Sequence, residues 1–297
     1  MMPSYTHTLI NPQNGELAFK VVGLDNYSFP DTLQRLSYYT VVLISEGQGK
    51  LQSGFSEHEF SDNTLLCFAP YQPFLLDTGS SKGYVINFHP DFFCIHKHHK
   101  EVACNGVLFN NIYQPPFHEL GARTTQKLLK IIGNMQEELR QEGLAQHELM
   151  VSFLKIFLIT ASRSRAGMVD AATTEEELSR REGHGEPFVL QKLKDAIEEH
   201  YRQKHSAGEY AQMLNISPKA LARMTKAHFS RTLTDMIAER IVIEAKRELY
   251  LTAKPVKAIA YELGFGDEYH FSRFFKNKAA VSPQVYRNKV GFARGEI

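Results

Sequence analysis

Two stretches of the chain, residues 210–235 and 258–287, repeat one local plan. Each has a short amphipathic pattern, a turn, and a second amphipathic pattern with basic side chains off its apolar face. In the later stretch, Gly264 lies where a helix ends in a left-handed residue, and Asp267 is a suitable N-cap for the next helix. Each stretch is therefore predicted to fold as a helix-turn-helix, whose second helix presents its N-terminal residues to DNA base edges.

The two stretches can be laid over one another residue by residue. The matched pairs, earlier residue first, are Ala211 and Ala260, Leu214 and Leu263, Leu221 and Phe271, Arg223 and Arg273, and Lys226 and Lys276. The offset is 49 before the turn and 50 after it, so the later turn has one extra residue. Ser217 and Pro218 add an N-cap followed by proline at the first helical position, which is a strong signal for a helix start.

A single helix is predicted between the two units, over residues 235–251. Its apolar stripe consists of Ile237, Ile241, Ala245 and Leu249. A helix of this length spans roughly 26 Å, and Pro255 ends it. With the width of each unit added, the two recognition helices are expected about one DNA turn, ~34 Å, apart.

The segment from residue 188 to residue 287 resembles the AraC/XylS family of bacterial transcription regulators. The resemblance is carried by Ile259-Ala260, Leu263-Gly264-Phe265, Asp267, Tyr269, Phe271-Ser272-Arg273, Phe275-Lys276, Ser282-Pro283 and Tyr286-Arg287. The chain has Ser230 and Ala280 where the family usually has glycine, and Gly266 where serine is more usual. If the first two positions need a positive φ, a side chain there costs about 1 kcal/mol.

The resemblance implies which side chains meet DNA. In the first unit these are Lys219, Ala222 and Arg223, and in the second they are Glu268, Tyr269, His270, Ser272 and Arg273. Lys226 and Lys276 are expected at phosphates, which position a protein without specifying sequence. The alternative for each is a solvated surface residue, and Arg273 has a second alternative in this family, a structural salt bridge. The resemblance also implies promoter DNA and RNA polymerase as partners, and activation rather than repression.

The distribution of charge agrees with a DNA-binding C-terminal half. Residues 187–297 carry 19 Lys and Arg against 12 Asp and Glu, a net charge of +7. Residues 1–186 carry 15 against 21, a net charge of −6. A basic half is suited to phosphate contacts, although this excess is modest by itself.

The chain is predicted to be a two-domain α+β protein with boundaries at residues 1–163, 164–186 and 187–297. Six β-prone runs lie at residues 38–45, 49–51, 58–60, 64–68, 74–77 and 84–88. Short strands at such spacing indicate a sandwich or a small barrel. In pattern and position the first domain resembles the cupin-like β-barrel that many AraC-type regulators carry as a sensor.

Two helices are expected after the strands, at residues 124–141 and 145–163. In the family, helices at this place carry the contact of a homodimer; packing within one subunit is the alternative. Residues 164–186 have few large apolar side chains and many charges, and are expected to be a linker. A short helix within them, at 174–181, is also compatible with the sequence.

A cupin-like barrel implies a small-molecule effector held between its sheets. Candidate lining residues are Tyr39, Val41, Phe68 and Phe74, and each could equally be plain core. A ligand-independent regulator, whose barrel only dimerises, is the alternative.

A histidine- and cysteine-rich stretch contains Cys94, His96, His98, His99, Glu101 and Cys104. Such ligand types suit zinc or copper, but Lys97 and Lys100 between them fit a polar loop equally well. No histidine lies between Ser61 and Ile86, where a metal-dependent cupin would need one. We therefore expect no cofactor and no enzymatic activity; a metal-using cupin enzyme fused to a DNA-binding domain is the rival hypothesis.

Three cysteines without a regular framework fit a reducing cytoplasm. The sequence shows no signal peptide and no apolar run long enough to span a membrane, so a cytoplasmic protein without a membrane partner is expected.

Overall fold

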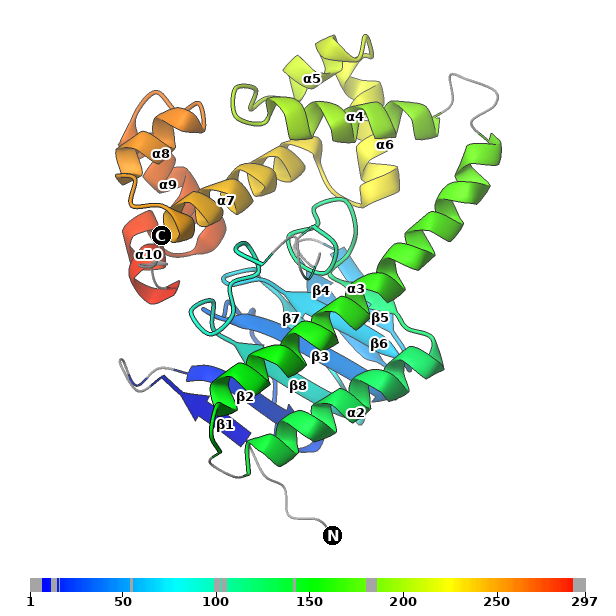
Figure 1. Ribbon diagram of the computed structural model, residues 1–297. Helices are drawn as coiled ribbons and strands as arrows, with labels where there is room; N and C mark the ends of the chain where they lie inside the picture. Colours follow the sequence, from blue (N-terminus) through cyan, green and yellow to red (C-terminus); the bar gives the residue numbers. More distant parts are fainter. Residues whose placement is uncertain are drawn as a thin grey trace. The chain divides into compact units, whose positions relative to one another are not determined.

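The computed structural model describes residues 7–11, 15, 17–53, 56–98, 102, 106–140, 143–179 and 186–290, and it describes side chains outside residues 166–187. The chain divides into two compact units (Figure 1). The first consists of Met1–Asn111 and Pro115–Gly167, and the second of Ile112–Gln114 and Met168–Ile297.

The first unit is built on a six-stranded antiparallel sheet in the order β1-β2-β8-β3-β6-β9. Its strands are β1 (His7–Ile10), β2 (Leu17–Gly23), β3 (Tyr39–Glu46), β6 (Thr64–Phe68), β8 (Lys82–Phe88) and β9 (Phe117–Glu119). The central strand β3 is buried on both faces from Tyr39 to Ile44, which explains its unbroken run of apolar and β-branched residues. β3, β6 and β8 confirm the strand predictions, whereas β1, β2 and β9 were not predicted.

A second, three-stranded sheet has the order β5-β4-β7. Its strands are β4 (Gly49–Ser53), β5 (Ser56–Phe60) and β7 (Leu75–Asp77). Leu51 and Leu76 of this sheet share one buried core with Val42, Leu66 and Val85 of the larger sheet. The sheets therefore pack face to face as a sandwich.

The expected closed barrel is not formed by the strands that the structure describes, because no ladder joins the two sheets. The physical reason lies at the turn between β3 and β4. Gly47 takes a φ of 109°, and its N–H donates to Asp62 at 2.5 Å. After this turn β4 pairs with β5 and β7 in the smaller sheet, because both sides of β3 are already occupied by β6 and β8.

Two helices cover the outer face of the six-stranded sheet, α2 (Ala122–Glu138) and α3 (Gln146–Ser179) (Figure 1). Their buried apolar residues, Leu128, Ile132, Met135, Met150, Leu154 and Phe157, pack into one cluster with Val41, Leu65 and Ile86 of the sheet. The predicted amphipathic helices are thus present. The structure continues α3 to Ser179, so most of the expected linker is helical; its Ala, Glu, Leu and Arg residues are good helix formers.

The second unit contains helices and the turns between them, and no strand, among its described residues. Its helices are α4 (Glu186–His200), α5 (Ala207–Met213), α6 (Pro218–Phe229), α7 (Leu233–Leu251), α8 (Val256–Glu262), α9 (Glu268–Ala279) and α10 (Pro283–Val290). The long α7 buries the predicted stripe Ile237, Ile241, Ala245 and Leu249, each at most 1% exposed. Helices from both repeats pack on α7, which is the common frame of the unit.

No helix within the described residues combines the length and the apolar character that crossing a bilayer requires.

Candidate nucleic-acid interface

The two predicted helix-turn-helix units are present with matching lengths. α5 and α8 each have 7 residues, and α6 and α9 each have 12. The two turns close in the same way: Ile216 N–H donates to the Ala211 carbonyl, and Phe265 N–H donates to the Ala260 carbonyl, both at 3.0 Å. The residue-by-residue overlay made from the sequence is therefore confirmed.

Each recognition helix begins at the predicted cap. Ser217 accepts a hydrogen bond from Ala220 N–H at 3.3 Å, with Pro218 at the first helical position. Asp267 accepts one from His270 N–H at 2.7 Å. These caps satisfy backbone donors that a helix start leaves unpaired, and they fix where α6 and α9 begin.

The recognition helices end in left-handed residues that are not glycine. Ser230 follows α6 with a φ of 53°, and Ala280 follows α9 with a φ of 64°. These are the two positions where the family usually has glycine. The expectation of a positive φ is confirmed, and the left-handed conformation is retained despite the Cβ atom.

The apolar faces of the recognition helices anchor them to the unit. α6 buries Leu221, Thr225 and Phe229. α9 buries Phe271 and Phe275, and Phe274 packs against Phe265 with ring centroids 5.1 Å apart. Because these faces point inward, the opposite faces of α6 and α9 are free to meet DNA.

The ten side chains predicted to meet DNA lie on α6 and α9, outside the buried positions of these helices. The exposed ones are Lys219, Ala222, Arg223, Lys226, Tyr269, His270, Arg273 and Lys276; Glu268 and Ser272 are half-buried. Tyr269 is 86% exposed, which is high for an aromatic side chain. The structure thus brings the predicted residues of each unit together on one surface.

The cations on this surface are not engaged within the described part of the chain. Lys219, Arg223, Lys226, Arg273 and Lys276 form no ion pair with any described residue. Lys278, one turn away on α9, instead pairs with Asp235 at 2.9 Å. The salt bridge considered for Arg273 is therefore not made to a described residue.

A buried acidic residue ties the frame together. Glu244 on α7 accepts from Arg202 at 2.7 Å, from Arg247 at 2.7 Å and from Arg240 at 3.3 Å. Burial alone would raise the pKa of Glu244, but the three guanidinium groups outweigh it and lower this pKa. The network joins the segment between α4 and α5 to α7, and so holds the first helix-turn-helix unit on α7.

Known proteins carry the same C-terminal pattern. A family model described as a helix-turn-helix domain matches residues 210–289. The chain is 23% identical over 175 residues to the HTH-type transcriptional activator RhaS of Enterobacter sp. (strain 638), covering 59% of this chain and 58% of that protein. It is 24% identical over 178 residues to RhaS of Salmonella schwarzengrund, with the same coverage. These matches agree with the resemblance of the C-terminal region to AraC/XylS regulators. The matches span 58% of the length of these relatives, so they leave the rest of each unaccounted for.

Two solved structures are also similar. The C-terminal domain of AraT, a response regulator from Geobacillus stearothermophilus, is 25% identical with a TM-score of 0.35, over 37% of this chain and 91% of that one. ToxT from Vibrio cholerae is 14% identical with a TM-score of 0.40, over 92% of this chain and 98% of that one. At these TM-scores the two structures add nothing to the resemblance, which is supported by the family model and the sequence relatives.

The residues predicted to line an effector pocket do not lie together. Tyr39 and Val41 face the helices, and Tyr39 stacks on Phe88 with ring centroids 4.9 Å apart. Phe68 and Phe74 lie between the two sheets and stack on each other at 3.9 Å. The alternation of a strand separates them, so one pocket cannot be lined by all four.

The predicted metal ligands are only partly within the described chain: His99, Glu101 and Cys104 lie outside it. Of the others, Cys94 is buried and accepts from Lys97 N–H at 3.4 Å, and His98 stacks on Phe93. The described residues contain no group of three or more His, Cys, Asp or Glu that could hold a metal ion.

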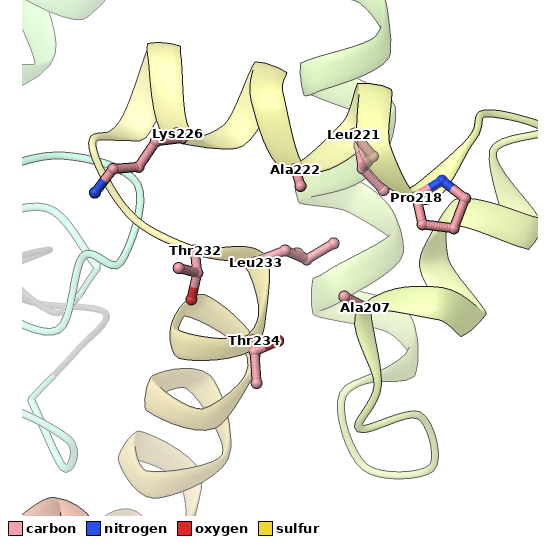
Figure 2. A pocket seen from close by; sticks show the side chains of 8 residues that line it. All are labelled: Ala207, Pro218, Leu221, Ala222, Lys226, Thr232, Leu233 and Thr234. Atoms are coloured by element: carbon pink, nitrogen blue, oxygen red, sulfur yellow. The ribbon is translucent and has the colours of Figure 1, made fainter.

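One feature of the interface was not predicted. A cavity of about 290 Å³ lies between α6 and the first turn of α7 (Figure 2). Pro218, Leu221, Ala222 and Lys226 of α6 line it, together with Ala207 of α5 and Thr232, Leu233 and Thr234 at the start of α7. A cavity depends on side-chain volumes across helices, and no local sequence signal reports it.

Proposed function

We propose that this AraC/XylS-family chain binds promoter DNA through both helix-turn-helix units and activates transcription in response to a small-molecule effector. The duplication of an exposed, basic recognition helix on one helical frame carries the proposal. The relatives named above are transcriptional activators, which supports activation, with RNA polymerase as the further partner. They are regulators rather than enzymes, and a cytoplasmic location is proposed because the target is DNA.

The proposed roles of the ten surface residues follow from their chemistry. Arg223 and Arg273 can each take guanine O6 and N7 in a bidentate pair, and His270 can reach a base edge. Lys226 and Lys276 are proposed at phosphates because they lie farther from the helix starts. If DNA lies across both units, the loss of one recognition helix weakens binding without abolishing the phosphate contacts of the other.

The effector is proposed to bind between the two sheets of the first unit. Thr40 and Asn87 are cross-strand partners there and are 0% and 1% exposed. Thr40 Oγ1 has no hydrogen-bond partner among the described residues, and the Asn87 amide lies within hydrogen-bonding reach of the Tyr27 hydroxyl. A buried polar group left without a partner costs about 1–3 kcal/mol, which a ligand or a water molecule recovers.

A ligand-independent regulator is the second candidate function. It is favoured by the close stacking of Phe68 on Phe74, which fills part of the same space. Thr40→Val separates the two candidates. If the Thr40 hydroxyl serves a ligand, the variant keeps or raises the midpoint of thermal unfolding, and its DNA binding no longer responds to an effector. If the residues between the two sheets are only structural, DNA binding by the parent chain already shows no response to an effector.

The chain is proposed to act as a homodimer through the outer face of α3. Leu149 and Ile156 are 41% and 51% exposed on that helix, two turns apart. Exposed apolar residues at this spacing form a stripe that a second copy can cover.

The test of DNA binding is a measured affinity for DNA obtained by selection from random sequence, at fixed salt. Arg223→Ala combined with His270→Ala should lower specific affinity by roughly thirtyfold or more, since each base contact contributes about 1–3 kcal/mol. Lys192→Ala, an exposed cation on α4, is the matched control and should bind as the parent chain does. Unchanged affinity in the double variant would overturn the proposal.

A further inference from the structure

The first helix-turn-helix unit has an apolar cavity beside its recognition helix α6, and we propose that this cavity receives the 5-methyl group of a thymine. The inference rests on the proposed DNA-binding function, and it names a base that the first unit reads. Ala222 is the residue at which the cavity meets the DNA-facing surface of α6.

The cavity is shaped by small and apolar groups. Leu221 and Leu233 are its buried lining residues, whereas Pro218 and Ala222, which also line it, are exposed (Figure 2). Its volume of about 290 Å³ exceeds the need of one methyl group, so the apolar edge of a neighbouring deoxyribose fits as well. The exposed lining residues Pro218 and Ala222 belong to α6, the helix that carries the predicted base contacts of this helix-turn-helix unit.

Among the four bases, only thymine presents a methyl group in the major groove. The other bases present donors and acceptors there, which would lose their hydrogen bonds to water against Pro218 and Ala222 without gaining others. Burial of a thymine methyl group in the cavity removes apolar surface from water, which is favourable in free energy. We therefore expect the cavity to favour thymine, because it buries the methyl group and offers no hydrogen bonds at Pro218 and Ala222 to the polar groups of other bases.

The charge beside the cavity places a DNA strand at its exposed lining residues. Lys226 lies one helical turn from Ala222 on the same side of α6, and it lines the cavity edge. It is exposed and makes no ion pair with a described residue, so its ammonium group is available to a phosphate. A strand held at Lys226 runs past Ala222.

The second helix-turn-helix unit supplies an internal comparison. The positions of Ala207, Pro218 and Ala222 in the first unit are taken by Val256, Glu268 and Ser272 in the second. Each replacement is larger or more polar. We therefore expect a thymine preference from the first unit and none of this origin from the second.

The test replaces each thymine of the selected DNA by deoxyuridine, one position at a time, which removes only the methyl group. Affinity is measured by fluorescence anisotropy at fixed salt with the full chain. One position in the first unit's half of the site should lose roughly three- to tenfold in affinity, the value of one buried methyl group. Ala222→Ser should abolish the difference between thymine and uracil at that position. Ala227→Ser, an exposed alanine on α6 that does not line the cavity, should keep it.

The outcomes separate this inference from the function on which it rests. Specific binding with no effect of deoxyuridine in the first half, or with an effect that survives Ala222→Ser, overturns the thymine cavity and leaves DNA binding intact. A selection that yields no enriched sequence overturns the proposed function itself, and the thymine cavity with it.

Discussion

Asn215 and Gly264 hold the same left-handed backbone conformation, with φ of 54° and 80°, at the same place in the two helix-turn-helix units. The first turn tolerates a side chain because asparagine visits this conformation at low cost. The second does not, because a Cβ atom at Gly264 would overlap the carbonyl oxygen of Arg202. The same turn is thus built twice, with different freedom to vary.

Gly264→Ala should lower the free energy of unfolding by about 2–4 kcal/mol, since it adds backbone strain and an overlap with Arg202. Gly266→Ala is the matched control: no atom lies within 4 Å of the position its Cβ would take, and its φ is not positive. Urea denaturation followed by circular dichroism measures both. Equal effects of the two variants would contradict the role assigned to Gly264.

Ala280→Gly should raise the free energy of unfolding by about 0.5–1 kcal/mol, and Ser230→Gly should act in the same direction. Both residues are exposed at a positive φ, so glycine removes strain without removing packing. Ala227→Gly, inside α6, is the control and should lower it by about 1 kcal/mol. Thermal unfolding of the three variants reports the sign, and a loss of stability in Ala280→Gly would show that φ is not strained there.

Glu244→Gln should destabilise the second unit by about 3 kcal/mol at neutral pH, because it leaves three guanidinium groups around a neutral amide. The folded-state pKa of Glu244 is lowered, so its contribution to stability is complete above the unfolded value of 4.5. That contribution is lost as the pH falls from 4.5 through the folded pKa.

The pH dependence of unfolding provides the check on Glu244. From pH 6 down to pH 3, the parent chain should lose more stability than the Glu244→Gln variant. Parallel pH profiles for the two chains would mean that Glu244 does not titrate with a lowered pKa in the folded state.

Ile156→Glu should shift a homodimer towards monomer by at least tenfold in dissociation constant, because it places a charge in the apolar stripe of α3. Lys130→Glu, an exposed site on α2 outside that stripe, is the matched charge control. Sedimentation equilibrium measures the constant. An Ile156→Glu variant that associates like the parent would place the dimer contact elsewhere.

The helix-turn-helix units could be predicted in detail because their signals are local. The left-handed residue, the N-cap and the apolar spacing each lie within a few residues of one another, as Gly264, Asp267 and Phe271 show. The apolar face of α9 followed from the spacing of Phe271, Phe274 and Phe275, whereas the DNA-facing positions were predicted from the family resemblance. Eight of those ten positions are exposed, and Glu268 and Ser272 are half-buried.

The N-terminal, sheet-containing unit was harder to predict because its arrangement depends on pairing between strands that lie far apart in the sequence. β9 has three residues and is a strand only through its ladder with β6. Barrel closure depends on sheet edges meeting in space, and no ladder joins the two sheets among the described strands. The split of Tyr39 and Val41 from Phe68 and Phe74 depends on which face of the larger sheet meets the smaller one.

The central claim is that one chain reads DNA with two helix-turn-helix units, and hydroxyl-radical footprinting on selected DNA tests it most directly. Each subunit should protect two patches about one helical turn, ~34 Å, apart. Arg223→Ala should weaken protection in one patch and His270→Ala in the other, at fixed salt. Protection of a single patch per subunit, or loss of the same patch in both variants, would contradict reading by two units.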